Sequence, residues 1–405
     1  MNTSGFGNGS DLCNHNLTSF NQTMDRMYTY FYLLLFIPGL LLNTTALWVL
    51  CRHISKRTKA VIFMINLALA DLTHILSLPL RIYYYFTHTW PFGRIVCLFC
   101  FYLKYFNMYA AIIFLVCISM QRCAFLLNPF RARRWRRRYD LVIAFTVWVV
   151  VGVACSPFIL MRSDSSTSTQ RASTPSEVTS TQQSTPFPAQ RQSTAIIRVT
   201  PESSCFKDLP IRKVPQSVGI SMITMCELFG FLIPLALIGY SSFRTVMSLR
   251  HKESQDQQSS TASSSARSRL QSVTSNGHSE KYQEQARAEK RRALRMVLGC
   301  YALFLFCFAP YHINFLLYLM VSQNLMTHCA TRLAVRQFHP ISLCIASLSC
   351  CLNPLLYYFL TAEFRKHLAK RTSSFSSSIL SSPVTSPSDF PIQCRLLRME
   401  STCSK

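Results

Sequence analysis

Five residues that could bind an anion stand in or beside long apolar stretches of this chain. Arg81, Lys104 and Arg162 belong to three different stretches, and Tyr105 and Tyr109 repeat at the spacing of one helical turn. A guanidinium offers two parallel donors to a phosphate, an ammonium adds a point charge, and a phenol adds a hydroxyl donor. The set could therefore hold a phosphate. Taken singly, each cation could instead extend its charge to a membrane surface.

A carboxylate inside an apolar stretch is the second unusual feature. Asp71 ends the run Asn66-Leu-Ala-Leu-Ala-Asp71, and Asn43 and Asn353 stand in two other apolar stretches. A carboxylate is costly in hydrocarbon and needs polar partners or a bound cation. The three residues predict either a sodium ion beside Asp71 or a polar network that only joins helices.

The third feature is a basic residue at the end of the apolar run that begins at Cys97. Arg122 stands there between Gln121 and Cys123. A guanidinium does not lose its proton, so Arg122 must reach the membrane interface or meet partners inside a helix bundle.

Motifs for catalysis do not occur in the sequence. It has no Gly-rich phosphate loop, no metal-ligand spacing and no activated nucleophile. We therefore predict no catalytic residue and no metal centre, and we do not expect an enzyme.

The elements that must position these residues are membrane-spanning helices. Hydrophobic residues make up 49% of the chain and charged residues 15%. A window of about 19 residues finds seven apolar runs, each long enough to cross about 30 Å of hydrocarbon. We predict an all-α membrane protein, a seven-helix transmembrane bundle. The runs are Tyr28–Leu50, Ala60–Phe86, Val96–Leu126, Leu141–Leu160, Val218–Val246, Met296–Val321 and Ala334–Leu360.

Charge and glycosylation signals predict the orientation. Basic residues gather after the first and third runs and before the sixth, and such short basic segments lie in the cytoplasm. The N-terminus is then extracellular and the C-terminus cytoplasmic. The net charge of +25 is thus mainly a signal of topology, and we expect no nucleic-acid partner. Four Asn-x-Ser/Thr acceptors fall in residues 1–27, at Asn2, Asn8, Asn16 and Asn21.

Four of the 17 cysteines fall in segments expected outside the cell. They are Cys13, Cys97, Cys205 and Cys329, and four cysteines allow three pairings. Our preferred pairing joins Cys97 to Cys205, which leaves Cys13 for Cys329.

The order of residues along the seven runs resembles the rhodopsin-like (class A) G-protein-coupled receptors. Further segments resemble the purinoceptor-like branch of that family, with its lysophosphatidylserine-sensing members. They include Phe63-Met-Ile-Asn66, Ser77-Leu-Pro-Leu-Arg-Ile-Tyr83 and Ala309-Pro-Tyr-His312. The family residues are Asn43, Leu67-Ala-Leu-Ala-Asp71, Cys97, Arg122, Trp148, Pro234, Phe304-x-x-Cys307-Phe308-x-Pro310 and Asn353-Pro354-Leu355-Leu356-Tyr357.

The resemblance implies a conformational switch with two departures from the family pattern. Members usually carry an acidic residue before the Arg, where this chain has Gln121, so we expect a weaker inactive-state lock and raised basal activity. Phe308 replaces the usual Trp of the sixth span. The proline kinks are expected hinges. The implied switch and coupling residues are Gln121, Arg122, Phe304, Phe308, Pro310, Asn353, Pro354 and Tyr357.

The resemblance also bears on the ligand. Nucleotide-sensing relatives usually carry a cation one turn beyond the His of the sixth span, where this chain has Phe315, and Leu343 stands at the ligand position of the last span. Fewer cations suit one phosphate, and apolar residues suit an acyl chain. We expect an extracellular lysophospholipid, specifically lysophosphatidylserine. Glu227 could accept its amine or bond a neighbouring helix. The implied ligand residues are Arg81, Lys104, Tyr105, Tyr109, Arg162, His312 and Phe315.

Outside the bundle, composition predicts disorder in two Ser- and Gln-rich inserts and in the tail. The receptor domain is expected over residues 28–371, with an extracellular insert at 163–204, a cytoplasmic insert at 250–286 and a tail at 372–405. The segment Glu363–Leu368 predicts a short amphipathic helix on the inner membrane face.

Implied partners are membrane lipids, a heterotrimeric G protein of the twelve/thirteen or q class, and arrestin at the plasma membrane. Two other interpretations stay open. One is a nucleotide-sensing purinergic receptor. The other, from a different class, is a seven-span transporter or channel with Asp71 as its ion site.

Overall fold

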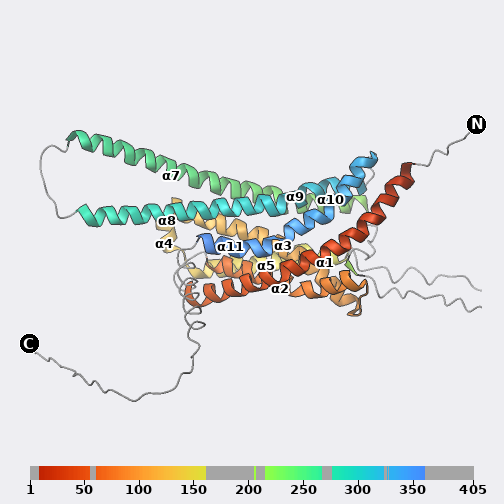
Figure 1. The fold of residues 1–405 in the computed structure, drawn as a ribbon. Helices are drawn as coiled ribbons and strands as arrows, with labels where there is room; N and C mark the ends of the chain where they lie inside the picture. The colour runs from red at the N-terminus through yellow and green to blue at the C-terminus, as the bar shows by residue number, and fades with distance from the viewer. Residues whose placement is uncertain are drawn as a thin grey trace, which may run out of the picture.

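The computed structural model shows a bundle of long helices running roughly alongside one another (Figure 1). It describes residues 9–54, 61–160, 205–206, 215–266, 276–322, 326 and 328–360. The regular structure within these ranges is helical throughout, and seven of the helices are long and apolar enough to cross a membrane. The predicted all-α, seven-span fold is therefore confirmed.

The first span ends in a π-helical turn at Leu50–Ile54, the next three spans are single helices, and each of the last three contains a break. A short helix, α4, connects α3 to α5. The helices are α1 (Gly9–Val49), α2 (Val61–Thr87), α3 (Gly93–Leu127), α4 (Pro129–Arg134), α5 (Arg137–Leu160), α6 (Gln216–Glu227), α7 (Ile233–Ala266), α8 (Asn276–Leu303), α9 (Ala309–Ser322), α10 (Cys329–Ser347) and α11 (Ser349–Leu360).

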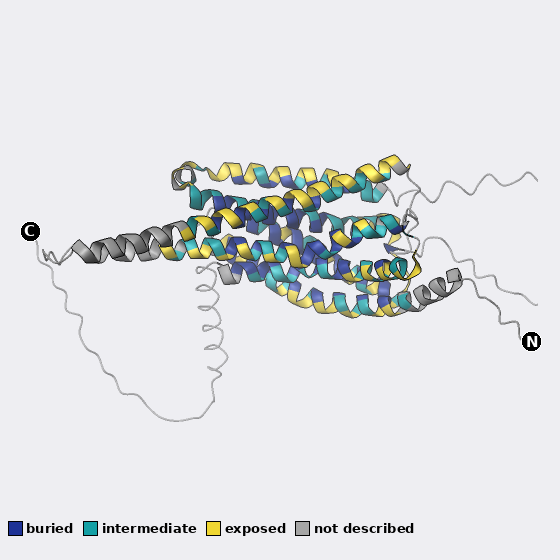
Figure 2. Ribbon diagram, turned by 90° about the horizontal axis from the view of Figure 1, so that it is seen from above, coloured by how far each residue is buried: buried dark blue, intermediate teal, exposed yellow. Residues whose placement is uncertain are grey.

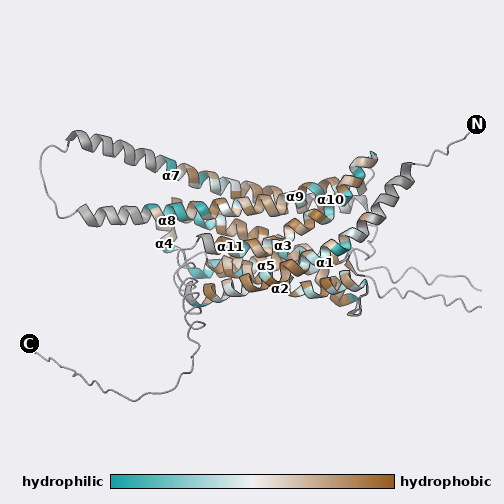
Figure 3. Ribbon diagram, viewed as in Figure 1, coloured by the Kyte–Doolittle hydropathy of each residue, from teal (hydrophilic) through white to brown (hydrophobic). Residues whose placement is uncertain are grey.

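The core of the bundle forms around α3. This helix packs against α2, α5, α7 and α8, so its side chains are the most central. Buried residues face inward and exposed residues outward (Figure 2), yet the exposed faces are largely apolar as well (Figure 3). That pattern is expected where the solvent is lipid, because hydrocarbon does not penalise an outward-facing Leu or Phe.

Wide helical turns precede two of the predicted hinge prolines. A π-helical turn at Leu228–Leu232 comes just before Pro234, and a second at Phe304–Phe308 comes just before Pro310. Proline lacks an N–H and its ring clashes with the carbonyl four residues earlier. The helical turn before each proline therefore contains one extra residue. These turns separate α6 from α7 and α8 from α9.

The last span is interrupted at Leu348, between α10 and α11. Pro354 lies inside α11 and cannot donate to the Cys350 carbonyl four residues earlier. Asn43 of α1 donates to that carbonyl instead, from Nδ2 at 2.7 Å. The side chain of one helix thus satisfies the acceptor that proline leaves exposed in another.

Helices extend into one segment for which composition predicts disorder. Within the insert at 250–286, α7 continues to Ala266 and α8 starts at Asn276. The Gln, Glu and Lys residues there are good helix formers, and extending an existing helix avoids the cost of nucleation. The first helix, α1, begins at Gly9, before the first predicted span, and buries Met24 among aromatic residues.

Several expectations fall outside the described residues. They are the insert at 163–204, Arg162, the tail at 372–405 and the amphipathic segment Glu363–Leu368. The side chains of the four glycosylation acceptors, Asn2, Asn8, Asn16 and Asn21, are also outside the described part of the chain.

Candidate functional site

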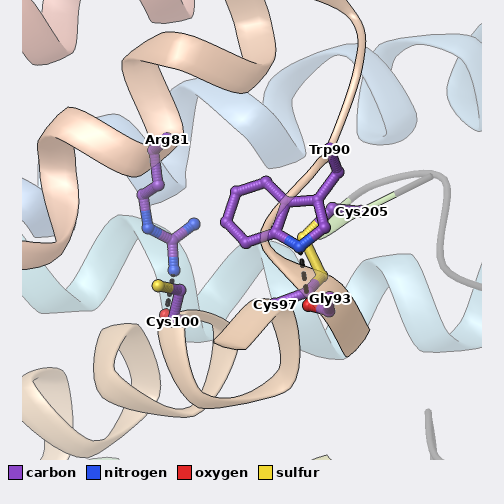
Figure 4. Close-up of a disulfide and its surroundings, with 6 residues drawn as sticks. All are labelled: Arg81, Trp90, Gly93, Cys97, Cys100 and Cys205. Atoms are coloured by element: carbon purple, nitrogen blue, oxygen red, sulfur yellow. Dashed lines mark hydrogen bonds between the residues drawn. A yellow bond between two sulfur atoms is a disulfide. The ribbon is translucent and has the colours of Figure 1, made fainter. Parts of the chain in front are cut away.

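Arg81 lies on the buried face of α2, close to the Cys97–Cys205 disulfide (Figure 4). Its side chain is only 2% exposed. One terminal nitrogen donates to the Cys100 carbonyl of α3, and the guanidinium lies 4.4 Å above the centre of the Phe206 ring. The Nε atom is buried without a hydrogen-bond partner. Arg81 therefore points into the bundle and does not extend to the membrane surface.

Lys104 lies one helical turn after Cys100 on α3, in the same region. Its Nζ lies 3.3 Å from the hydroxyl of Tyr32 on α1. Among the described residues, no carboxylate forms an ion pair with Arg81 or Lys104. Two cations inside a bundle without a compensating acid make a site that an anion would neutralise.

Aromatic rings and a disulfide hold this cationic site in place. The Trp90 Nε1 atom donates to the Gly93 carbonyl at 2.8 Å, which shapes the turn between α2 and α3 (Figure 4). The disulfide joins the start of α3 to Cys205, and Phe206 follows directly. Cys329 is also disulfide-bonded, but the side chain of Cys13, its expected partner, lies outside the described residues. Rings in mutual contact around the site are Tyr28, Tyr32, Tyr84, Tyr85, Trp90 and Phe206.

The remaining predicted ligand residues form a second group, between α3, α6 and α9. Tyr105 stacks on Phe158 of α5 at 4.8 Å between ring centres, and Tyr109 meets the edge of His312 at 6.0 Å. The His312 Nδ1 atom lies 3.2 Å from Glu227 Oε1. The sequence suggested two roles for Glu227, to accept a ligand amine or to bond a neighbouring helix. In the structure Glu227 makes the contact between helices.

An apolar wall adjoins this second group. Phe315 of α9 stacks on Tyr311, with ring centres 5.6 Å apart. Tyr311 belongs to the main hydrophobic core, and the partly buried Phe315 and Leu343 pack against that core. Phe315 is therefore packed in an apolar environment.

The polar network around Asp71 joins four helices. Asn353 of α11 donates from Nδ2 to Asp71 Oδ2 at 3.0 Å. Asn107 of α3 donates to the Cys350 sulfur at 3.3 Å, and Tyr357 donates to the Met64 carbonyl of α2 at 3.2 Å. Asn43 belongs to the network through the Cys350 carbonyl and not by bonding Asp71.

Oxygen atoms in this network remain available to a cation. The Oδ1 atoms of Asn43, Asn107 and Asn353 are buried and have no hydrogen-bond partner. Hard cations prefer oxygen ligands, so the donor set fits a sodium ion beside Asp71. The described residues contain no cluster of His, Cys, Asp or Glu that would hold a transition metal.

At the other end of the bundle, Gln121 faces a carboxylate that the sequence analysis missed. Its Nε2 atom donates to Asp140 Oδ1 of α5 at 2.7 Å, while its Oε1 atom has no hydrogen-bond partner. The Gln121 amide is thus bound to Asp140 and does not restrain Arg122. Asp140 lies one residue before the predicted fourth span, where an acidic residue looks like part of a loop.

The aromatic residues expected to switch the sixth span lie in its wide turn. Phe304 and Phe308 are both fully buried. Phe304 stacks on Phe231 of the fifth span with ring centres 5.9 Å apart, and Phe231 also stacks on His312 at 5.4 Å. A column of rings therefore connects the second ligand group to the wide turn before Pro310.

His74 is a further residue that the sequence analysis missed. Both of its ring nitrogens are buried and have no hydrogen-bond partner. It lies three residues after Asp71 and seven before Arg81, so helical spacing places all three on one face of α2. This spacing is the signal in the sequence that could have identified His74.

Comparison with known proteins places this geometry in context. The family model described as "7 transmembrane receptor (rhodopsin family)" matches residues 42–357. A mouse protein named as a putative purinoceptor, number 10 of its series, is 43% identical over 382 residues, covering 94% of this chain and 97% of that protein.

More distant relatives match over similar lengths. A human protein named "Probable G-protein coupled receptor 174" is 39% identical over 345 residues, covering 85% of this chain and 86% of that protein. A chicken protein named "Lysophosphatidic acid receptor 6" is 28% identical over 346 residues, covering 85% of this chain and 93% of that protein. The family match extends from the first to the last membrane-spanning helix.

Proposed function

This chain belongs to the rhodopsin family of seven-transmembrane receptors, and we propose that within the family it responds to an extracellular lysophospholipid. The family is non-enzymatic and couples to heterotrimeric G proteins. The observation that carries the ligand proposal is the pair of buried Arg81 and half-buried Lys104, which has no carboxylate partner among the described residues. A monoanionic or dianionic phosphate would supply the missing charge.

The geometry of the two cations supports a phosphate in particular. Arg81 keeps an unbonded Nε atom, and Lys104 is held by a single phenol. A guanidinium edge and an ammonium from two facing helices can bind different oxygens of one phosphate. The names of the lysophosphatidic acid receptors among the relatives are consistent with a ligand of this class.

The rest of the ligand would extend toward Tyr105, Tyr109 and the apolar wall at Phe315. An acyl chain gains roughly 0.8 kcal/mol for each buried methylene, so an apolar wall contributes affinity that a nucleotide would not use. Lysophosphatidylserine is the specific ligand we propose. The second candidate, a nucleoside diphosphate, is favoured by the purinoceptor name of the mouse relative and of a human one.

The orientation follows from the same proposal. The ligand site at the disulfide end faces outward at the plasma membrane, and Arg122 and α4 face the cytoplasm. The partners there are a heterotrimeric G protein of the twelve/thirteen or q class, and arrestin after activation.

A ligand panel tests the proposal. Cells that express the chain are challenged with lysophosphatidylserine, lysophosphatidic acid and a nucleoside diphosphate, and G-protein activation is measured against untransfected cells. We expect a response to lysophosphatidylserine at the lowest concentration. A response to the nucleoside diphosphate alone would contradict the lipid assignment and support the second candidate. Ion flux through the purified protein in liposomes without G-protein activation would instead favour a channel or transporter.

We also expect sodium to weaken the agonist response through Asp71. An ion held by Asp71 and the amide oxygens would favour one arrangement of the bundle, so replacing sodium by choline should lower the half-maximal agonist concentration about five-fold. The Asp71→Asn variant removes the charge that holds the ion and should give the same value in both salts. Equal values for the unmodified receptor in sodium and choline would refute the site.

A further inference from the structure

Asp140 is a buried carboxylate that binds two donors from different parts of the chain. It lies in the first turn of α5 and is only 1% exposed. Its Oδ1 atom accepts from Gln121 Nε2 and from Trp135 Nε1, each at 2.7 Å. Gln121 belongs to α3, and Trp135 lies in the link between α4 and α5. One carboxylate oxygen therefore joins three segments.

The Trp135 side chain is also held by neighbouring rings. Its ring meets Phe125 of α3 at 5.9 Å and Tyr139 of α5 at 5.4 Å between centres, both edge to face. The link after α4 is thus fixed against the same end of α3 that carries Arg122. α4 lies between these two anchors, at residues 129–134.

Gln121, Trp135 and Asp140 form a junction between α3, the link and α5, and its chemistry favours a single arrangement. Hydrogen bonds to an ionised acceptor are stronger than neutral ones, and a carboxylate in the first turn of a helix is stabilised by the helix dipole. Moving the link away would take one donor from the buried Asp140 carboxylate and would separate the Trp135 indole N–H from its acceptor, which is costly. The hydrogen bond from Trp135 therefore opposes any shift of the link away from α5.

We propose that Asp140 supplies from α5 the carboxylate that the Gln121-Arg122-Cys123 triplet lacks, and that it positions α4 and its link for coupling to the G protein. Asp140 is a positioning residue, acting through Gln121 and Trp135. The inference rests on the family's coupling to G proteins and not on the identity of the ligand.

The junction also predicts how a family-like triplet would behave here. Gln121→Glu replaces the amide that donates to Asp140 by a second carboxylate, and two buried like charges oppose each other. That single change should therefore disrupt the junction. Adding Asp140→Asn should restore it, because the Asn amide can donate to the carboxylate introduced on α3 while its oxygen still accepts from Trp135.

The first measurement is hydrogen–deuterium exchange of the full-length receptor in lipid nanodiscs without ligand. In Asp140→Leu we expect backbone amides of residues 128–136 to exchange about ten-fold faster than in the unmodified receptor, because charged hydrogen bonds are lost. Trp135→Phe keeps an aromatic ring but removes one donor, and should change exchange in the same direction by less. Tyr139→Phe, which keeps the ring beside Trp135, is the matched control and should change nothing.

The second measurement is nucleotide exchange on purified heterotrimers, one from each G-alpha class, with and without lysophosphatidylserine. For Asp140→Leu and for Gln121→Glu, the G-protein concentration that gives half-maximal exchange should rise about five-fold or more. The double variant Gln121→Glu/Asp140→Asn should return to within about two-fold of the unmodified receptor, as expected for a coupled pair.

Three results would overturn the proposal. Unchanged amide exchange in Asp140→Leu and Trp135→Phe would overturn the proposal, and so would faster amide exchange with unchanged G-protein dependence. A double variant as defective as Gln121→Glu alone would also overturn it. If lysophosphatidylserine has no effect on the unmodified receptor, the ligand proposal fails, while ligand-free amide exchange and basal nucleotide exchange still test Asp140.

Discussion

Replacing Arg81 with alanine is expected to raise the half-maximal concentration of lysophosphatidylserine at least about 30-fold. Losing one partner of a buried, hydrogen-bonded charge pair typically costs about 2 kcal/mol or more of binding free energy. Arg81 qualifies because it is buried, has no carboxylate partner among the described residues and keeps an unbonded Nε atom. The measurement is G-protein activation in cells, normalised to receptor at the cell surface.

Two further variants make this result specific. Arg94→Ala removes an exposed cation at the start of α3, at the same end of the bundle, and should leave the response within about two-fold, since surface charges contribute little. Arg81→Lys keeps the charge but loses the two parallel donors, and should give an intermediate shift. An unchanged response in Arg81→Ala at equal surface expression would exclude Arg81 from the phosphate site.

Gly230→Ala is expected to disrupt the packing between the third, fifth and sixth spans. A Cβ atom at Gly230 would lie 2.5 Å from Tyr109 Cε1 and 3.1 Å from His312 Cε1. The Tyr109 ring cannot swing away freely, because it packs between Phe158 and His312. Overpacking of this kind costs about 1–3 kcal/mol. We therefore expect a lower melting temperature for the purified receptor and a weaker agonist response.

Gly219→Ala provides a matched control on the same span. A Cβ atom there would meet no other atom within 4 Å, so the change adds a methyl group without a clash. It also replaces glycine by a better helix former, which favours α6 by up to about 1 kcal/mol. Its melting temperature should be equal to or above that of the unmodified receptor. If Gly230→Ala and Gly219→Ala behave alike, Tyr109 does not pack tightly against Gly230.

The network around Asp71 shows both what sequence reasoning found and what it missed. An acid in an apolar run is evident from the sequence, and in the structure Asn353 donates a hydrogen bond to it. The part played by Asn43 was not evident, because its partner is a backbone carbonyl 307 residues away that proline leaves without a donor. Such a bond depends on two helices meeting at the correct height and rotation.

The sequence by itself determined the seven membrane-spanning helices and the charged residues within them. A run of about 20 apolar residues is a local property, and so is an acid or base inside it. Only the tertiary structure decided which partners these residues have. Gln121 bonds Asp140 and not Arg122, and Arg81 lies against Phe206. The physical reason is that partner choice depends on helix rotation and packing, which hydropathy leaves undetermined. The continuation of the helix over 251–266 was likewise missed. A polar composition shows that a segment prefers water, but whether it extends a helix depends on the helical turn that precedes it.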